Sequence, residues 1–339
     1  MLFPLLAVLA WTSACAPSRV IEMGPSSGYR AAFPTMDMSG QLSSAFRAVK
    51  QLQVSVDYRV YSFAEDDAPS GLDLEREDVV ARAAATTTVS ETRRATAVIV
   101  SRSSRGILLL TAAHAVFRPD TIIEYFGPPT RVAVDPRRRI RSISIKDVQT
   151  NWVLGLPGTR PFAVLAWDAA EDVALIGFRH AGADDLSRAW PLEVPAGDPD
   201  DLVPGSFVYV LGYPGGYRMV SRGVATPKDD GRDGFVIDGN WNQGVSGGAV
   251  LAMRGTDEAL EWVGMARAAA AVSEQRFVPA EVDAEQYDPA VPYEGPIFLE
   301  DMLRIQYGVT LSVSMTTIRA FIDGHRAELV RLGYDVPRL

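Results

Sequence analysis

The chain has 339 residues, of which 47% are hydrophobic and 22% charged, so it can bury a core of its own without disulfides or metals. The 42 acidic residues outnumber the 33 basic ones, which argues against a general nucleic-acid-binding protein. Cys15 is the single cysteine, so no disulfide can form within the chain. Because the sequence has neither a His/Cys metal-ligand spacing nor a phosphate-binding glycine loop, we expect no metal and no cofactor.

The N-terminus begins with an apolar run, MLFPLLAVLAW, followed by the small residues TSACA. This run is too short to span a bilayer, which takes roughly 20 residues in a helix. Residues 1–15 are therefore predicted to be a cleaved export signal, and the Gly/Ser/Pro-rich residues 16–44 a flexible tether. Export would place the protein in the cell envelope, the periplasm or the medium.

Two processing routes are open for this signal, and both depend on the residues around Cys15. The preceding TSA resembles the lipobox of bacterial lipoproteins, in which the cysteine is lipidated and holds the protein on a membrane. The run ACA also fits the cleavage site of a soluble secreted protein. An uncleaved apolar N-terminus is the third reading.

From about residue 45 onward, short runs rich in β-branched and aromatic residues alternate with turn residues. Examples are LQVSVDYRVYSF, GILLLTAA, DVALIGF, SFVYVLGY and GVTLSVS. Turn signals between them favour a barrel or sandwich over βαβ units. The acidic, Pro-containing residues 271–301 are predicted to be a long loop. The C-terminal SMTTIRAFIDGHRAELVRLGY has helical periodicity and predicts a closing helix at about 315–332.

Three short motifs carry the candidate chemistry. An apolar strand leads directly into His114 in LLLTAAHAV, Asp172 precedes an apolar strand in DAAEDVALIGF, and Ser246 lies among glycines in NQGVSGGAV. The last motif also matches the Gly-x-Ser-x-Gly elbow of α/β-hydrolases, which needs a helix after the serine. The residues that follow Ser246 have the pattern of two strands joined by a turn, which disfavours this esterase hypothesis. Its best downstream acid and base would be Asp301 and His325.

The order histidine, aspartate, serine and the residues around them resemble the trypsin-like (chymotrypsin-fold) serine peptidases, in particular secreted or lipoprotein bacterial members. The resemblance covers about residues 90–330. It implies an all-β fold with two antiparallel six-stranded β-barrels and a C-terminal α-helix. The peptidase domain would span 45–339, with a first barrel at about 45–190 and a second at about 200–314; no PDZ-like module is expected after it.

The same resemblance assigns a role to each candidate site residue. Ser246 would be the nucleophile, His114 its general base and Asp172 the group that orients the imidazole. The backbone N–H groups of Gly244 and Ser246 would form the oxyanion hole. The residues expected around the specificity pocket are Asn240, Ala266, Arg267 and Ala268.

These assignments predict a serine endopeptidase that hydrolyses protein or peptide substrates through an acyl-enzyme intermediate. Val245 replaces the aspartate with which animal enzymes complete zymogen activation, so that switch should be absent. The alternative is a catalytically silent relative that keeps the fold as a binding module, favoured if residues 271–301 fill the cleft.

Overall fold

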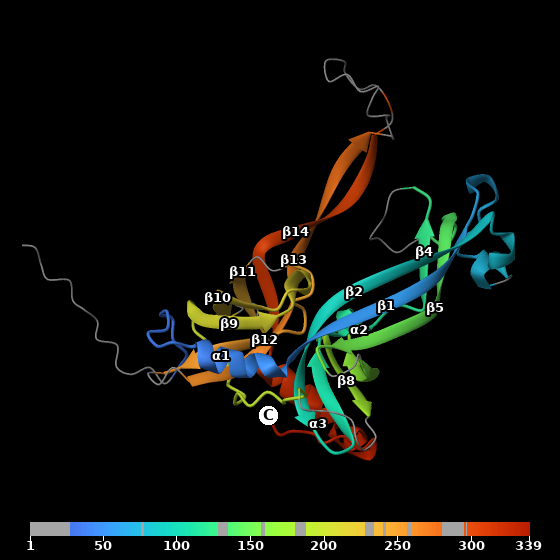
Figure 1. The fold of residues 1–339 in the computed structure, drawn as a ribbon. Helices are drawn as coiled ribbons and strands as arrows, with labels where there is room; N and C mark the ends of the chain where they lie inside the picture. Colours follow the sequence, from blue (N-terminus) through green and yellow to red (C-terminus); the bar gives the residue numbers. More distant parts are fainter. Residues whose placement is uncertain are drawn as a thin grey trace, which may run out of the picture.

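The computed structural model describes residues 28–75, 78–127, 135–156, 160–179, 188–227, 234–239, 242–255, 259–279, 295 and 297–339. In this part of the chain, antiparallel strands form two β units, which contact each other through β1 and β9 (Figure 1). The predicted export signal and Cys15 lie outside the described residues.

The first unit is an open sheet of eight strands in the order β4-β5-β1-β2-β3-β8-β7, with the short β6 paired to β5. Its strands are β1 (Val49–Ser62), β2 (Ala85–Arg102), β3 (Gly106–Thr111), β4 (Thr121–Tyr125), β5 (Ile140–Leu154), β6 (Arg160–Pro161), β7 (Ala163–Asp168) and β8 (Val173–Arg179). Figure 1 shows β1, β2 and β5 as a long arm that extends away from the barrel.

The second unit is a closed barrel in the order β10-β11-β14-β13-β12-β9. Its strands are β9 (Ser206–Gly212), β10 (Met219–Pro227), β11 (Phe235–Gly239), β12 (Ala249–Arg254), β13 (Ala259–Pro279) and β14 (Ile297–Ser314). The helices of the described residues are α1 (Ser39–Ala45), α2 (Ala113–Val116), α3 (Met315–Arg331) and the 3₁₀ turns η1 (Phe46–Ala48), η2 (Glu65–Asp67), η3 (Asp73–Glu75), η4 (Val79–Arg82), η5 (Pro199–Asp201) and η6 (Pro214–Gly216).

The predicted all-β class, the six-stranded second barrel and the C-terminal helix are confirmed. The first unit differs from the expected six-stranded barrel, because it has eight strands and does not close within the described residues. The reason lies in the long strands: β1 pairs with β2 and β5 over almost its whole length, so the sheet continues outward where a barrel would turn back.

The core explains why β9 and β12 read as continuous apolar runs. Side chains alternate across a strand, so successive residues face opposite sides. On β9, Val208 and Val210 belong to the barrel interior, whereas Phe207, Tyr209 and Leu211 join a cluster that includes the first unit. Both strands are thus buried on two faces, which fixes the two units against each other.

Helix α3 closes the molecule as its periodicity predicted. Ser314 Oγ caps it by accepting the N–H of Thr317 at 3.1 Å. Its apolar face contacts β13, β14 and β8 and buries Ile318, Ile322 and Leu329. The helix therefore packs on both units.

Residues 28–45 do not behave as the loose tether that the sequence predicted. Tyr29 is buried, pairs with Arg254 as an isolated bridge and donates its hydroxyl to Glu261 Oε2 at 2.7 Å. Residues 39–45 then form α1, whose last residue is in the core. Any flexible tether must therefore end before residue 28.

The predicted loop at 271–301 is wrong at both ends. Residues 271–279 of β13 pair with 305–297 of β14, so a long antiparallel hairpin projects from the barrel (Figure 1). The acidic, aperiodic side chains hid it, because pairing uses main-chain groups that every sequence has. The binding-module alternative would place residues 271–301 in a cleft, and of these, residues 280–294 and 296 lie outside the described residues.

Candidate active site

His114 and Asp172 lie together at one end of the first sheet. Strand β3 leads into α2, which carries His114, and Asp172 occupies the turn between β7 and β8. Asp172 Oδ2 lies 2.8 Å from His114 Nδ1, and Oδ1 accepts the backbone N–H of His114 at 2.9 Å. The carboxylate thus holds both the ring and the main chain of His114.

The exposure of these two side chains differs, and the difference suits their expected roles. Asp172 is 7% exposed, whereas His114 is 45% exposed. Asp172 also has a φ of 58°, a left-handed conformation that aspartate tolerates better than most residues. A proton on Nδ1, facing the carboxylate, would leave Nε2 as the acceptor of the ring.

Arg267 on β13 was expected near the specificity pocket, but its guanidinium faces Asp172. Arg267 Nε lies 3.2 Å from Asp172 Oδ2, and its Nη2 donates to the carbonyl of Ala170 at 3.3 Å. A carboxylate this well buried is stabilised by a nearby cation. The second unit therefore contributes a contact to the aspartate of the first.

The loop that carries Ser246 is pressed against the first sheet. The carbonyl of Ser246 accepts the N–H of Thr96 on β2 at 2.9 Å. Gly247 has a φ of 90°, and a Cβ there would collide with the carbonyl of Thr96. Glycine is therefore required at 247 by both conformation and space.

Thr96 ties the serine loop to the strand that leads into His114. Its Oγ1 donates to the carbonyl of Gly244 at 2.6 Å and accepts the N–H of Tyr213 at 2.9 Å. Its carbonyl accepts the hydroxyl of Thr111, the last residue of β3, at 2.7 Å. Sequence reasoning missed Thr96, since no local pattern around it signals contacts with residues so far along the chain.

Gly244 adopts a backbone conformation that favours glycine. Its φ is 107°, and a Cβ would collide with the carbonyl of Tyr213. The loop is fixed on that side by a 2.7 Å bond from the N–H of Gly215 to the carbonyl of Gln243. Among the described residues, no acceptor is bonded to the N–H of Gly244 or Ser246, and no hydrogen bond joins the Ser246 hydroxyl to His114.

The remaining residues expected at the specificity pocket have other surroundings. Asn240 lies outside the described residues. Ala266 is buried and exchanges two main-chain bonds with the serine loop, accepting the Gly247 N–H at 2.8 Å and donating to the Gly248 carbonyl at 2.9 Å. The backbone of Ala268 pairs with Leu311 within the barrel.

The hydrolase-elbow reading of Ser246 is wrong. The serine loop is followed by a strand, β12, where an elbow requires a helix. His325, its candidate base, lies in α3, where Nδ1 is 2.9 Å from the carbonyl of Phe321 and the ring packs on the Phe321 ring. It is a packed histidine of the closing helix.

Taken together, an antiparallel barrel beside a curved antiparallel sheet, with a buried aspartate on a histidine at their junction, defines the chymotrypsin-like class of folds. Residues 95–260 match the family model described as trypsin-like peptidase domain. Residues 95–260 therefore carry a trypsin-like peptidase domain, and the trypsin-like part of the resemblance inferred from the motifs is confirmed. No curated protein matches the chain.

Solved structures with similar folds are bacterial proteases at low identity. The Rv3671c protease from M. tuberculosis, in its active form, is 15% identical, with 98% of this chain and 96% of that chain covered and a TM-score of 0.42. The HtrA-type protease AlgW with tripeptide is 14% identical, with 88% of this chain covered and a TM-score of 0.42. The chain spans 65% of the length of AlgW. These likenesses are distant, so the family assignment rests on the family-model match.

Proposed function

We propose that the protein is a serine endopeptidase in which Ser246, His114 and Asp172 act as a catalytic triad. The observation that carries the proposal is the His114–Asp172 pair at 2.8 Å, beside a Ser246 loop bonded through Thr96 to the same sheet. A trypsin-like peptidase domain implies protein or peptide substrates.

The reaction would proceed in two steps. Ser246 Oγ attacks the carbonyl carbon of the scissile bond while its proton passes to His114 Nε2. Asp172 stabilises the imidazolium, and the N–H groups of Gly244 and Ser246 stabilise the oxyanion. His114 then gives the proton to the departing amine, which leaves an acyl group on Ser246. Water, deprotonated by His114, hydrolyses this ester and restores the serine.

Among the described residues, no hydrogen bond joins the Ser246 hydroxyl to His114, and this is compatible with the mechanism. Catalytic hydrogen bonds in unliganded structures are often long and shorten only when substrate binds. Gly244 and Gly247 have φ values of 107° and 90°. They hold the main chain of Ser246 in place without a hydrogen bond between its hydroxyl and His114. In the part of the chain that the structure describes, the N–H groups of Gly244 and Ser246 have no hydrogen-bond acceptor, which also supports the proposed oxyanion hole.

A fluorophosphonate probe tests the proposal, because it reacts with a serine only when the serine is activated. We expect one equivalent to label Ser246, with labelling lost in Ser246→Ala and in His114→Ala and retained in His325→Ala. Labelling that needs His325 would overturn the assignment of the base. A folded wild-type protein that is not labelled would instead be the catalytically silent binding module.

We also propose that the protein is exported, with Cys15 as the site of lipid attachment. Acyl chains add about 0.8 kcal/mol of membrane binding per buried CH₂, so several together would hold the chain firmly. In the described residues, no helix has the length and apolarity to cross a membrane. Mass spectrometry of the mature N-terminus tests the proposal. An acylated Cys15 supports both parts of it, and an unmodified chain starting at Ala16 or Pro17 contradicts lipid attachment and leaves export without a lipid anchor.

A further inference from the structure

Strand β2 has a free edge over most of its length. It pairs with β1 from residue 85 to residue 98, but it pairs with β3 only from Val98 onward. On that second side, no strand among the described residues pairs with residues 85–94, and all ten of these residues are exposed. An unpaired edge presents main-chain N–H and C=O groups that can pair with another extended chain.

The contacts of Thr96 show which residues offer these groups. Its N–H and its C=O both point away from β1, toward Ser246 and Thr111 respectively. In an antiparallel strand the direction of these groups alternates from one residue to the next, and the β1–β2 register has no shift. The even-numbered residues 86, 88, 90, 92 and 94 therefore direct their N–H and C=O groups to the free edge.

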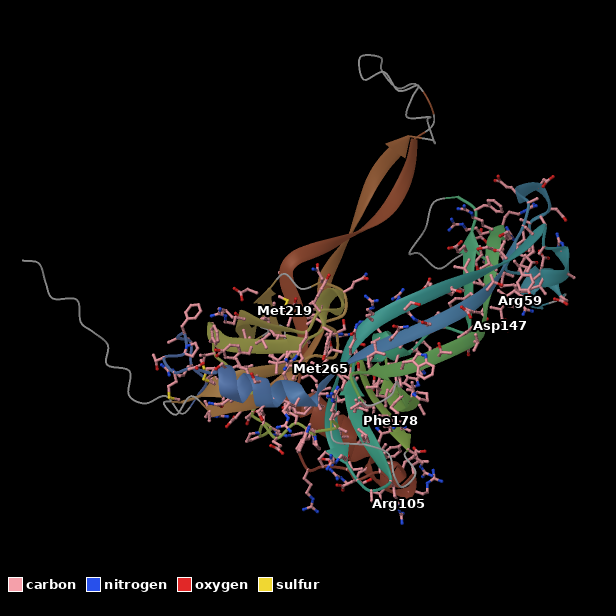
Figure 2. All side chains as sticks on the ribbon, viewed as in Figure 1. Arg59, Arg105, Asp147, Phe178, Met219 and Met265 are labelled. Carbon is pink, nitrogen blue, oxygen red and sulfur yellow. The ribbon has the colours of Figure 1, made fainter. Side chains whose placement is uncertain are left out.

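The free edge starts at the candidate active site. Thr96, which ends it, is bonded to the carbonyl of Ser246, so the open positions run outward from the serine loop. Figure 1 shows β1 and β2 extending away from the barrel, and Figure 2 places Arg59 near the outer end of this arm, with Asp147 nearby on β5. Nine residues of strand span about 30 Å.

We propose that the free edge of β2, residues 86–94, binds an extended segment of a polypeptide substrate as an added strand that continues from the bond held at Ser246. The inference rests on the proposed function and deepens it. Recognition would use mainly main-chain groups, which every polypeptide has, so it would favour long, unfolded chains over short peptides. The polar run TTTVSETRR keeps such an edge soluble without closing it.

Binding to the intact Ser246→Ala protein tests this without any cleavage, with β-casein as a long unfolded probe. Thr88→Pro, added to that protein, removes an outward N–H while leaving the pairing with β1, which uses odd-numbered residues. One lost main-chain bond and the disturbed neighbours should weaken binding about tenfold. Thr88→Ala keeps the N–H and is the matched control, with binding expected within about twofold. Equal binding by both variants, or equal weakening, would overturn the proposal.

Amide hydrogen exchange gives a second readout, independent of whether Thr88→Pro folds. On addition of β-casein to the Ser246→Ala protein, the amides of residues 86, 88, 90 and 92 should gain at least about tenfold protection. Those of 87, 89 and 91, already bonded to β1, should change little. Protection confined to other parts of the chain would refute strand addition. Hydrolysis of a four-residue peptide amide by the wild-type protein tests the endopeptidase separately, so the two proposals can fail independently.

Discussion

The two β units are built from the same kind of antiparallel strand pairing, but one closes and the other does not. In the barrel of β9 to β14 every strand is paired on both sides, whereas the sheet of β1 to β8 ends in β4 and β7 and leaves one side of β2 free. The closed unit carries Ser246 and Gly244, the proposed nucleophile and oxyanion donor. The open unit carries His114 and Asp172 in its fully paired part, and beyond that part it offers main-chain groups.

A closed barrel and an open sheet thus both contribute residues to the candidate active site. Thr96 stands at the border, because β2 is paired with β3 beyond it and free before it. The same residue receives the serine loop from the barrel. The proposed chemistry therefore depends on the junction of the two units and not on either unit alone.

The largest expected effect tests whether Ser246 of the barrel and His114 of the open sheet act together in catalysis. Ser246→Ala and His114→Ala should each lower kcat on a peptide substrate by about 10⁴- to 10⁶-fold, and the double variant should be no worse. Additive losses would show that the two residues act separately. His325→Ala, which removes the packed histidine of α3, is the control and should keep near wild-type kcat.

The junction itself can be broken at Gly247. Gly247→Ala would drive a Cβ into the carbonyl of Thr96 and displace the serine loop from β2. We expect kcat to fall by at least about 10²-fold, the loss typical of a misplaced oxyanion donor. Gly308→Ala has the same φ of 90° but no atom within 4 Å of the new Cβ, so it measures the backbone strain alone. Similar losses in the two variants would refute the clamp at Thr96.

The next prediction concerns the stability of the fold and a buried lysine near the junction of the two units. Lys50 on β1 is 7% exposed, and burial, with Arg218, Arg188 and Arg47 nearby, lowers its pKa to about 8. The unfolded chain, with an ordinary lysine pKa near 10.4, binds the proton more tightly. The charge therefore destabilises the fold fully below about pH 8, and this penalty disappears as the pH rises toward 10.

Lys50→Met should remove that penalty. We expect the variant to exceed the wild type in free energy of unfolding by up to about 3 kcal/mol at pH 7, with the difference shrinking as the pH approaches 10. Chemical denaturation at several pH values measures it. A difference that does not depend on pH would mean that the charge of Lys50 is fully solvated or compensated.

The smallest effect concerns Arg267, the barrel residue that contacts the aspartate of the open sheet. Arg267→Gln should lower kcat by about tenfold, because Asp172 loses a group that holds it in place. Arg222→Gln, on the exposed side of β10, is the control. An unchanged kcat in the Arg267 variant would leave that residue a packing role only.

The sequence predicted the parts of the molecule that depend on local signals. The apolar run of β3 ending at His114, the strand that follows Asp172, and the period and cap of α3 are all set by neighbouring residues. The roles proposed for Ser246, His114 and Asp172 stay predictions, although the structure brings the last two to hydrogen-bonding distance.

Features that depend on distant pairing could not be predicted in the same way. The hairpin of β13 and β14 has acidic, aperiodic residues, and only main-chain pairing reveals it. The contacts of Thr96 with Gly244 and of Arg267 with Asp172 join residues roughly a hundred or more positions apart, and no local pattern signals them. The open first sheet likewise follows from how far β1 stays paired on both sides, which is a property of three strands together.

The most direct test of the account is to trap the intermediate that the junction is proposed to form. The wild-type protein is mixed with a chromogenic peptide ester, quenched in acid within its first turnover and mapped by mass spectrometry. We expect one acyl group per chain, carried by the peptide that contains Ser246, and none on the same timescale in His114→Ala. An acyl group on another residue, or ester hydrolysis with no acylated Ser246 at any quench time, would contradict it.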